Sequence, residues 1–246
     1  MKTLLTYGHT EALDYGIEYL KEKGFRIAIN LNDKPDAVLL PVPSLDAQGN
    51  IPGGDSFKRF LKSIPTNIPV IGGKLDHPFF RDLKTVDLLQ EETYLWGNAV
   101  ITAHCAVKTA CRHLPVILPG LPVLVIGWGR IGKVLAQLLS RMGAKVTVAS
   151  RKSNHAAEIH GLGYEAISSE HIRPRPYRVI FNTAPAPVLT LPPDSRCLAI
   201  DLASVQGIYG DHVIWARGLP NRDAPESSGR LIAEAVVRYF QKEEAV

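Results

Sequence analysis

One segment of the chain reads Val123-Leu-Val-Ile-Gly-Trp-Gly-Arg-Ile-Gly-Lys133, and a later one reads Lys145-Val-Thr-Val-Ala-Ser-Arg-Lys152. The apolar run before the glycines predicts a buried strand, and the apolar spacing from Val134 to Leu139 predicts a helix after them. The second segment is apolar again and predicts a parallel partner strand. A strand, a glycine-rich turn, a helix and a strand form a βαβ unit. The chain is therefore predicted to be an α/β protein with a doubly wound parallel sheet.

The three glycines of the turn have separate expected roles. Gly127 permits the tight bend, Gly129 lets the backbone approach a pyrophosphate, and Gly132 lets the helix pack closely on the strand. The free N–H groups at the start of that helix attract the phosphates. Any tight strand-to-helix turn could contain such glycines, but here a strand precedes them and a helix follows. The whole segment is predicted to bind a dinucleotide through Gly127, Trp128, Gly129, Arg130, Ile131 and Gly132.

The end of the second strand indicates which dinucleotide fits. NAD-binding proteins usually place an Asp or Glu there for the ribose hydroxyls, and in this chain the position falls at Ser150, before Arg151 and Lys152. A carboxylate would repel a 2′-phosphate, whereas Arg151 can bind it bidentately and Lys152 adds a positive charge. NADP is therefore the predicted cofactor. The alternative interpretation is a pair of solvated loop cations.

Composition excludes several classes of function. The 246 residues include 28 Lys and Arg against 24 Asp and Glu, so no nucleic-acid-binding surface is expected. The three cysteines lack metal-ligand spacing, and any disulfide would leave one of them unpaired. A reducing cytoplasm fits this usage. We expect a protein without a metal site, a signal peptide or a membrane span.

Apolar runs and helical patterns alternate along the chain, which predicts two α/β domains with parallel sheets. The first comprises residues 1–95 together with a returning C-terminal helix at 226–246. The second, residues 96–225, comprises a connecting helix and a Rossmann domain. The expected strands are Thr3–Tyr7, Arg26–Asn30, Ala37–Leu40, Pro69–Ile71, Val123–Ile126, Lys145–Ala149, Tyr164–Ile167, Val179–Asn182, Cys197–Asp201 and Val213–Ala216, and the further expected helices are Glu11–Lys23, Ser56–Ile64, Thr93–Leu114 and Glu226–Lys242.

Ligands of open α/β sheets bind outside the carboxyl ends of the strands, and polar or Gly/Pro-rich residues follow most strands of this chain. A cleft between two such edges is the expected active site. Besides the glycine turn and Ser150–Lys152, the segments that follow expected strands are Asn182-Thr183-Ala184-Pro185, Asp201-Leu202-Ala203-Ser204 and Arg217-Gly218-Leu219-Pro220 in the second domain, and Tyr7–His9, Pro41–Ser44 and Gly72–Lys74 in the first.

These motifs make the chain resemble the family of the A subunit of dipicolinate synthase. The likeness covers about Trp96 to the C-terminus, with five motifs in the same order and spacing. It implies the layout of D-2-hydroxyacid dehydrogenases, in which a flavodoxin-like first domain precedes a Rossmann domain. The matching motifs are Gly-Trp-Gly-Arg-Ile-Gly (127–132), Ala-Ser-Arg-Lys-Ser (149–153), Phe-Asn-Thr-Ala-Pro (181–185), Ile-Asp-Leu-Ala-Ser (200–204) and Gly-Leu-Pro (218–220).

The resemblance also implies an activity and a partner. The family oxidises dihydrodipicolinate to pyridine-2,6-dicarboxylate with NADP in spore-forming bacteria, and works with a flavoprotein-like B subunit. Because a ring hydride and a proton are removed, the site needs cations for two carboxylates and a group that takes the proton. A small carboxylated substrate is therefore expected. Whether the chain also forms a homo-oligomer is left open by the sequence.

Three residues are the candidates for catalysis. His104 replaces a glutamate of the family pattern on the connecting helix and could take the proton. Lys74, and Arg217 in place of a family proline, could each bind a carboxylate. The alternatives are a helix-face histidine, a solvated lysine and an arginine paired with Asp201 or Asp223.

The remaining cofactor contacts are expected at the strand ends. Asn182 and the turn Thr183-Ala184-Pro185 suit the ribose or diphosphate. Asp201 could anchor the nicotinamide side or instead cap an Asx turn. Ala203, Gly218 and Pro220 belong to the last two loops of the same edge.

The leading hypothesis is thus an NADP(H)-dependent oxidoreductase of the dipicolinate synthase A type. One alternative is a 2-hydroxyacid or imine reductase on the same scaffold, although no clear Arg, Glu and His triad is present. The other is a non-catalytic or regulatory NADPH-binding module or partner subunit. Residues on the substrate side that differ from the family pattern, such as His104 and Arg217, keep this alternative open.

Overall fold

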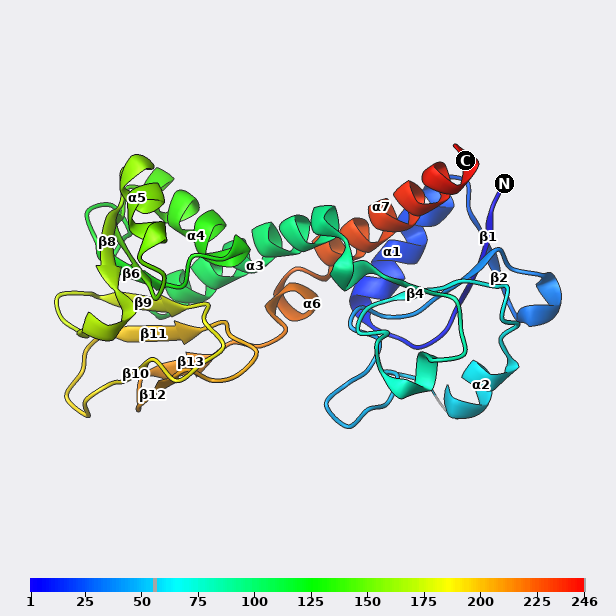
Figure 1. Ribbon diagram of the computed structural model, residues 1–246, viewed down its shortest axis with the longest axis horizontal. Coiled ribbons are helices and arrows are strands. Elements are labelled where there is room, and N and C mark those ends of the chain that lie inside the picture. Colours follow the sequence, from blue (N-terminus) through cyan, green and yellow to red (C-terminus); the bar gives the residue numbers. More distant parts are fainter. Residues whose placement is uncertain (55–56, 246) are drawn as a thin grey trace. The chain divides into compact units, whose positions relative to one another are not determined.

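The computed structural model describes residues 1–54 and 57–245 (Figure 1). Backbone contacts divide the chain into two compact units. Unit 1 consists of Met1–Asn98 and Pro220–Val246, and unit 2 of Ala99–Leu219. Helix α3 (Glu92–His113) contributes residues to both. The sequence predicted a division into a substrate part and a cofactor part at residues 95/96 and 225/226. This functional division stays a prediction.

Unit 2 contains a six-stranded sheet whose neighbouring strands are all parallel. The spatial order is β13-β11-β9-β6-β7-β8, which is the Rossmann order when the strands are numbered along the chain. This confirms the predicted doubly wound sheet. The strands are β6 (Pro122–Ile126), β7 (Lys145–Ser150), β8 (Glu165–Ser168), β9 (Val179–Asn182), β11 (Leu198–Asp201) and β13 (Val213–Trp215), with α4 (Arg130–Arg141), α5 (Asn154–Gly161) and the short helix η4 (Ser169–His171) between them.

Two features of unit 2 were not predicted. Strands β10 (Leu189–Thr190) and β12 (Ile208–Tyr209) form a separate parallel ladder beside the main sheet. Each is only two residues long, so neither has a periodic sequence signal. The ladder brings the chain after β9 next to the chain after β11, and both segments belong to the edge where ligands were expected.

Unit 1 contains a five-stranded parallel sheet in the order β2-β1-β3-β4-β5, which is the flavodoxin-like order. Successive residues of its strands point to opposite faces, so Leu4 and Leu39 enter one core and Leu5 and Val38 the other. The elements are β1 (Thr3–Thr6), β2 (Arg26–Ala28), β3 (Ala37–Leu39), β4 (Val70–Gly72), β5 (Thr85–Asp87), α1 (Glu11–Glu22), α2 (Phe57–Ser63), α6 (Leu219–Asp223) and the short helices η1 (Leu31–Asp33), η2 (Pro78–Phe80) and η3 (Leu88–Gln90).

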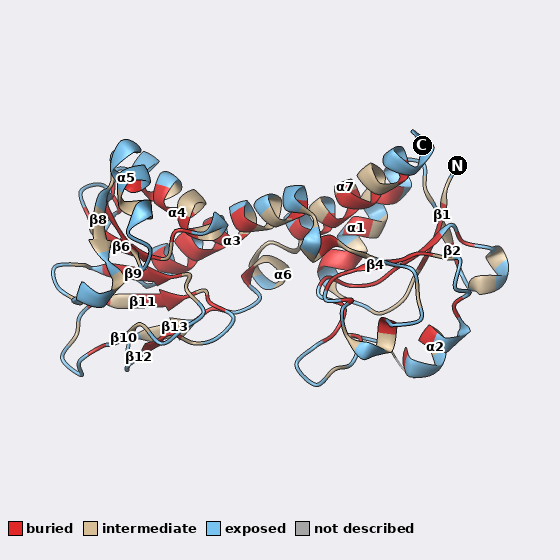
Figure 2. Ribbon diagram, in the orientation of Figure 1, coloured by how far each residue is buried: buried red, intermediate tan, exposed pale blue. Residues whose placement is uncertain are grey.

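The C-terminal helix α7 (Pro225–Glu244) packs against α1, as the expected return of the chain requires (Figure 1). The two backbones come close where Gly16 faces Gly229, since a Cβ on Gly229 would overlap the carbonyl oxygen of Ala12. Ile232 and Val236 enter the same core as the first strand, and the apolar face of α7 is buried (Figure 2). The predicted helix 56–64 is observed as α2, and its predicted first residue, Ser56, lies outside the described residues.

The three cysteines differ in exposure, which predicts their reactivity. Cys111 is exposed, whereas Cys105 and Cys197 are buried, and burial raises the pKa of the Cys197 thiol to about 12. Cys197 therefore stays protonated at pH 8, and only thiolates react quickly. We expect Ellman's reagent to modify Cys111 alone in the folded protein at pH 8, and all three thiols in guanidinium chloride. In a Cys111→Ser variant no fast phase should remain; fast labelling of Cys197 there would contradict the described burial.

Candidate nucleotide-binding site

The glycine turn after β6 has the geometry that each glycine was expected to provide. Gly127 has a φ of 100°, which side chains disfavour, and a Cβ there would overlap the hydroxyl of Thr183. A Cβ on Gly132 would overlap the carbonyl oxygen of Gly127, so α4 packs directly on the turn. A Cβ on Gly129 would meet nothing within 4 Å, which leaves open space in front of this residue. Gly127 and Gly132 thus shape the turn, and Gly129 leaves room for a ligand.

The N-terminus of α4 suits an anion. Its N-cap is Gly129, no side chain caps the helix, and the first turn contains no acidic residue. Gly129 has no side chain that could cap the first turn, and the helix dipole favours a negative charge there. Open space before Gly129 and an uncapped helix start together fit a pyrophosphate.

Trp128 has a different place from its neighbours. Its side chain is buried against Tyr164, with ring centroids 6.1 Å apart, and the Nζ of Lys133 lies 5.6 Å from its ring centre. Lys133 also donates to Glu158 of α5 at 2.6 Å, and this bond lowers the pKa of the Glu158 carboxyl. Trp128 thus packs on the segment after α5, and Lys133 ties the start of α4 to α5. The expected contact of Trp128 with the cofactor stays a prediction.

Ser150, Arg151 and Lys152 lie at the end of β7, and His155, which was not predicted, contacts Ser150. Arg151 and Lys152 are exposed, and neither forms an ion pair within the described part of the chain. The Ser150 hydroxyl accepts from the backbone N–H of Lys152 at 3.3 Å and lies 2.7 Å from the Nδ1 of His155. Sequence reasoning missed His155. Its position five residues after Ser150, at the start of a helix that follows a strand, was the available signal.

Asn182 and Asp201 form a buried network at the ends of β9 and β11. Asn182 donates to Asp201 at 2.9 Å and to the carbonyl of Ala184 at 3.1 Å. The Asp201 carboxylate also accepts from the N–H groups of Ala203, Gly207 and Ile208, at 3.0, 2.6 and 2.8 Å.

These four donors occupy the acceptor positions of the Asp201 carboxylate, and both side chains are inaccessible to solvent. These bonds are of the kind that the alternative interpretation, a turn-capping Asp201, requires. Contact of Asp201 with the nicotinamide side stays a prediction. The same saturation leaves Asp201 without an acceptor for Arg217, which was one of the alternatives for that arginine.

The neighbouring loop residues are arranged by the same network. Thr183 donates its hydroxyl to the carbonyl of Ile126 at 2.9 Å, which joins the end of β9 to the glycine turn. Ala184 donates its N–H to Asn182 at 3.0 Å, and Pro185 is exposed. Ala203 is buried, and its carbonyl accepts from the indole N–H of Trp215 at 3.1 Å. Of the expected cofactor contacts, Thr183 and Ala184 lie beside the glycine turn.

The catalytic candidates are not joined to one another. His104 is exposed on α3, Arg217 is exposed with its guanidinium 5.3 Å from the ring centre of Trp215, and Lys74 lies in unit 1. Lys74 has a φ of 60°, and its backbone N–H donates to Asp87 at 3.2 Å. No hydrogen bond or ion pair connects His104 and Arg217, the two candidates in unit 2, among the described residues. Gly218, after Arg217, has a φ of 65° and belongs to unit 2, whereas Pro220 belongs to unit 1.

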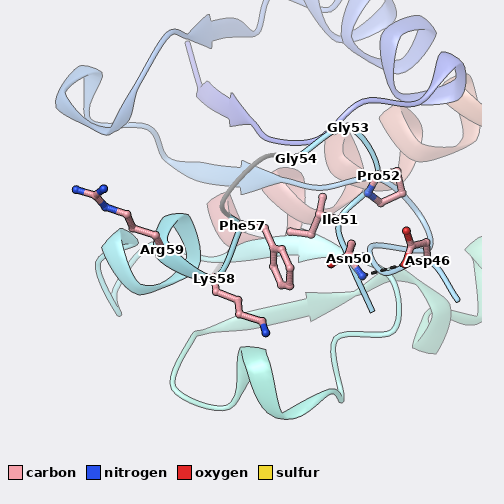
Figure 3. Close-up of a pocket in the computed structure, with 9 residues that line it drawn as sticks. All are labelled: Asp46, Asn50, Ile51, Pro52, Gly53, Gly54, Phe57, Lys58 and Arg59. Atoms are coloured by element: carbon pink, nitrogen blue, oxygen red, sulfur yellow. Dashed lines mark hydrogen bonds between the residues drawn. The ribbon is translucent and has the colours of Figure 1, made fainter. Parts of the chain in front are cut away.

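Unit 1 carries a separate cavity of about 730 Å³ that sequence reasoning missed (Figure 3). It lies between the loop after β3 and the start of α2, and Ile51 and Phe57 form its apolar part. Asn50 donates its backbone N–H to Asp46 at 2.9 Å, which closes the loop, while Arg59 points away from the cavity. The lining offers one lysine, Lys58, as a cation. No cluster of metal-ligating side chains occurs in the described part of the chain, and no described helix is long and apolar enough to cross a membrane.

Comparison with known proteins extends the likeness over nearly the whole chain. No protein-family model matches it. The A subunit of dipicolinate synthase from Bacillus subtilis (strain 168) is 23% identical over 256 residues, which cover 91% of this chain and 86% of that protein. The solved structure of the same subunit from Bacillus halodurans is 23% identical, with a TM-score of 0.81 and 97% of each chain covered.

Two further structures share the fold. That of dipicolinate synthase A chain from Bacillus subtilis has a TM-score of 0.79 at 20% identity, covering all of this chain and 97% of that one. Transhydrogenase from Sinorhizobium meliloti has a TM-score of 0.66 at 15% identity, covering 98% and 94%. Sequence motifs, the curated relative and the shared fold agree, and the predicted resemblance to the A subunit of dipicolinate synthase is confirmed.

Proposed function

We propose that the protein is an NADP(H)-dependent oxidoreductase that oxidises dihydrodipicolinate, or a related small cyclic carboxylate, by hydride transfer. One observation carries the cofactor: α4 begins at Gly129, which has open space before it, and Arg151 and Lys152, which form no ion pair among the described residues, follow the adjacent strand. The substrate class rests on the resemblance to the A subunit of dipicolinate synthase.

Each part of the site has a proposed task. The N–H groups after Gly129 bind the pyrophosphate, and Arg151 and Lys152 bind the 2′-phosphate. A bound nicotinamide would supply the hydride acceptor. Asp201 and Asn182 hold the loops that follow β9 and β11, so that Thr183 and Ala184 keep their place beside the glycine turn.

The substrate side is proposed from exposed polar groups. The Arg217 guanidinium lies over the Trp215 ring, which limits its motion and leaves its N–H groups free for a carboxylate. Lys74 adds a positive charge for a second carboxylate, and His104 takes the ring proton. We further propose a B-type partner, because the curated relative is one subunit of a synthase, and a cytoplasmic location.

His155 is proposed as a further ligand of the 2′-phosphate. Its Nδ1 is engaged by Ser150, so Nε2 is the ring nitrogen left to donate to a phosphate. A His155→Ala variant should bind NADPH about tenfold more weakly, as the loss of one hydrogen bond to a charged group predicts. NADH affinity should change less than twofold, which fluorescence titration measures. His160→Ala, exposed on the same helix, is the control; an equal loss for NADH would contradict the assignment.

The proposed activity is tested by binding followed by turnover. The purified chain is titrated with NADPH and NADH by intrinsic fluorescence, and NADP reduction is then assayed with freshly made dihydrodipicolinate. The assay is run with and without a B-type subunit. Reduction of NADP that depends on dihydrodipicolinate supports the proposal. Tight NADPH binding without turnover in either assay would overturn the enzymatic part and favour a cofactor-binding module.

A further inference from the structure

A second charged site lies at the other edge of the unit 2 sheet. The segment 173–178 leads into β9 and the segment 192–197 into β11, and these two strands pair with Val179 beside Leu198. Between the segments is a groove of about 1140 Å³, which we call the arginine groove. Because all strands are parallel, their amino ends lie at one edge and the glycine turn, which follows the carboxyl end of β6, at the opposite edge. The arginine groove is therefore separate from the nucleotide site.

The charge of the arginine groove is strongly positive. Four arginines line it, and Asp194 is the one acidic residue of its described lining. Arg175 and Asp194 are 3.9 Å apart and are 91% and 79% exposed, so this pair is weak. The others, Arg173, Arg178 and Arg196, are exposed and form no ion pair within the described residues. Mutual repulsion of these guanidinium groups would be relieved by a ligand with several negative charges.

The backbone of the groove is stiff and poor in donors. Pro174, Pro176 and Pro192 line it and have no N–H, so these positions offer an anion no backbone donor and the arginine side chains are the main cationic groups. Each segment contains a hydrogen-bonded turn, in which Tyr177 donates to Pro174 at 3.1 Å and Ser195 donates to Pro192 at 2.9 Å. Stiff turns that present arginines lose little conformational entropy on binding.

Shape and composition select the kind of ligand. Small molecules are usually enclosed by their pockets, whereas the arginines here stand exposed along an open groove. A nucleic-acid surface would call for a more basic chain and several aromatic rings, but the charge excess is 28 to 24 and Tyr177 is the one aromatic ring of the described lining. We propose that the arginine groove binds an acidic segment of a partner polypeptide, whose carboxylates pair bidentately with the guanidinium groups.

The test uses the full chain and a fluorescein-labelled octaglutamate peptide, with anisotropy measured at low and at physiological salt. We expect binding that weakens with salt, and an Arg173→Gln/Arg196→Gln variant that binds at least tenfold more weakly. The matched control, Arg81→Gln/Arg112→Gln, removes two exposed arginines elsewhere and should change the affinity less than twofold. NADPH affinity and the circular dichroism spectrum of both variants report that the fold is intact.

Three results would overturn the proposal. Equal losses in both double variants would show a general charge effect. Tighter binding of an oligothymidylate than of octaglutamate would indicate a nucleic acid. If citrate displaced the peptide completely and bound as tightly as the peptide does, the groove would be a site for small anions. None of these readouts depends on turnover, so the proposal can fail independently of the proposed enzyme activity.

Discussion

A variant with Arg151→Ala and Lys152→Ala should bind NADPH about 100-fold more weakly than the unchanged chain, while its NADH affinity stays within twofold. Both cations are exposed at the end of β7 and have no ion pair among the described residues. A 2′-phosphate would gain one bidentate and one simple charge-assisted contact from them. A hundredfold change corresponds to about 2.7 kcal/mol, which is within reach of two such contacts at a solvated site.

The control for this variant removes an arginine and a lysine where no phosphate is expected. Arg112→Ala/Lys145→Ala meets this need, because Lys145 begins the same strand at its opposite end and both residues are exposed. Fluorescence titration with both dinucleotides should show no selective loss in the control. An unchanged chain that binds NADH as tightly as NADPH would refute the assignment of Arg151 and Lys152, whatever the variants do.

The sheet of unit 2 could be predicted from the sequence because each of its main signals is local. The apolar run before Gly127 and the helical spacing after Gly132 lie within one βαβ unit, and the observed β6, α4 and β7 follow them closely. Strand β5 could not be predicted in this way. Its three residues include one apolar side chain, Val86, and it becomes a strand because β4 offers a free edge with Val70 beside Thr85.

The geometry of the candidate nucleotide site could be predicted where it depends on space around the backbone. The three glycines have the expected geometry, since their roles follow from the lack of a Cβ. The surrounding contacts depend on how distant segments meet. The Ser150–His155 contact depends on where α5 begins, and the saturation of Asp201 depends on the loop up to Ile208 folding back. Motif spacing contains no information on either.

The Asp201 network should matter most for stability. Asp201 is fully buried and accepts three backbone N–H groups as well as the Asn182 amide, so its removal leaves several buried donors without acceptors. An unpaired buried donor costs about 1–3 kcal/mol, and some of these would gain water as the loop relaxes. We expect an Asp201→Ala variant to lose about 4 kcal/mol of unfolding free energy.

This loss should lower the Tm of unit 2 by about 15 °C, since 1 kcal/mol shifts a domain of this size by about 4 °C. Differential scanning calorimetry would measure it, with Asp211→Ala as the control, because Asp211 is an exposed carboxylate of the same unit. The control should stay within about 0.5 kcal/mol of the unchanged chain. If Asp201 instead contacted the nicotinamide side directly, the variant would lose NADP affinity at an unchanged Tm. The two roles therefore give opposite results in calorimetry and titration of the same two proteins.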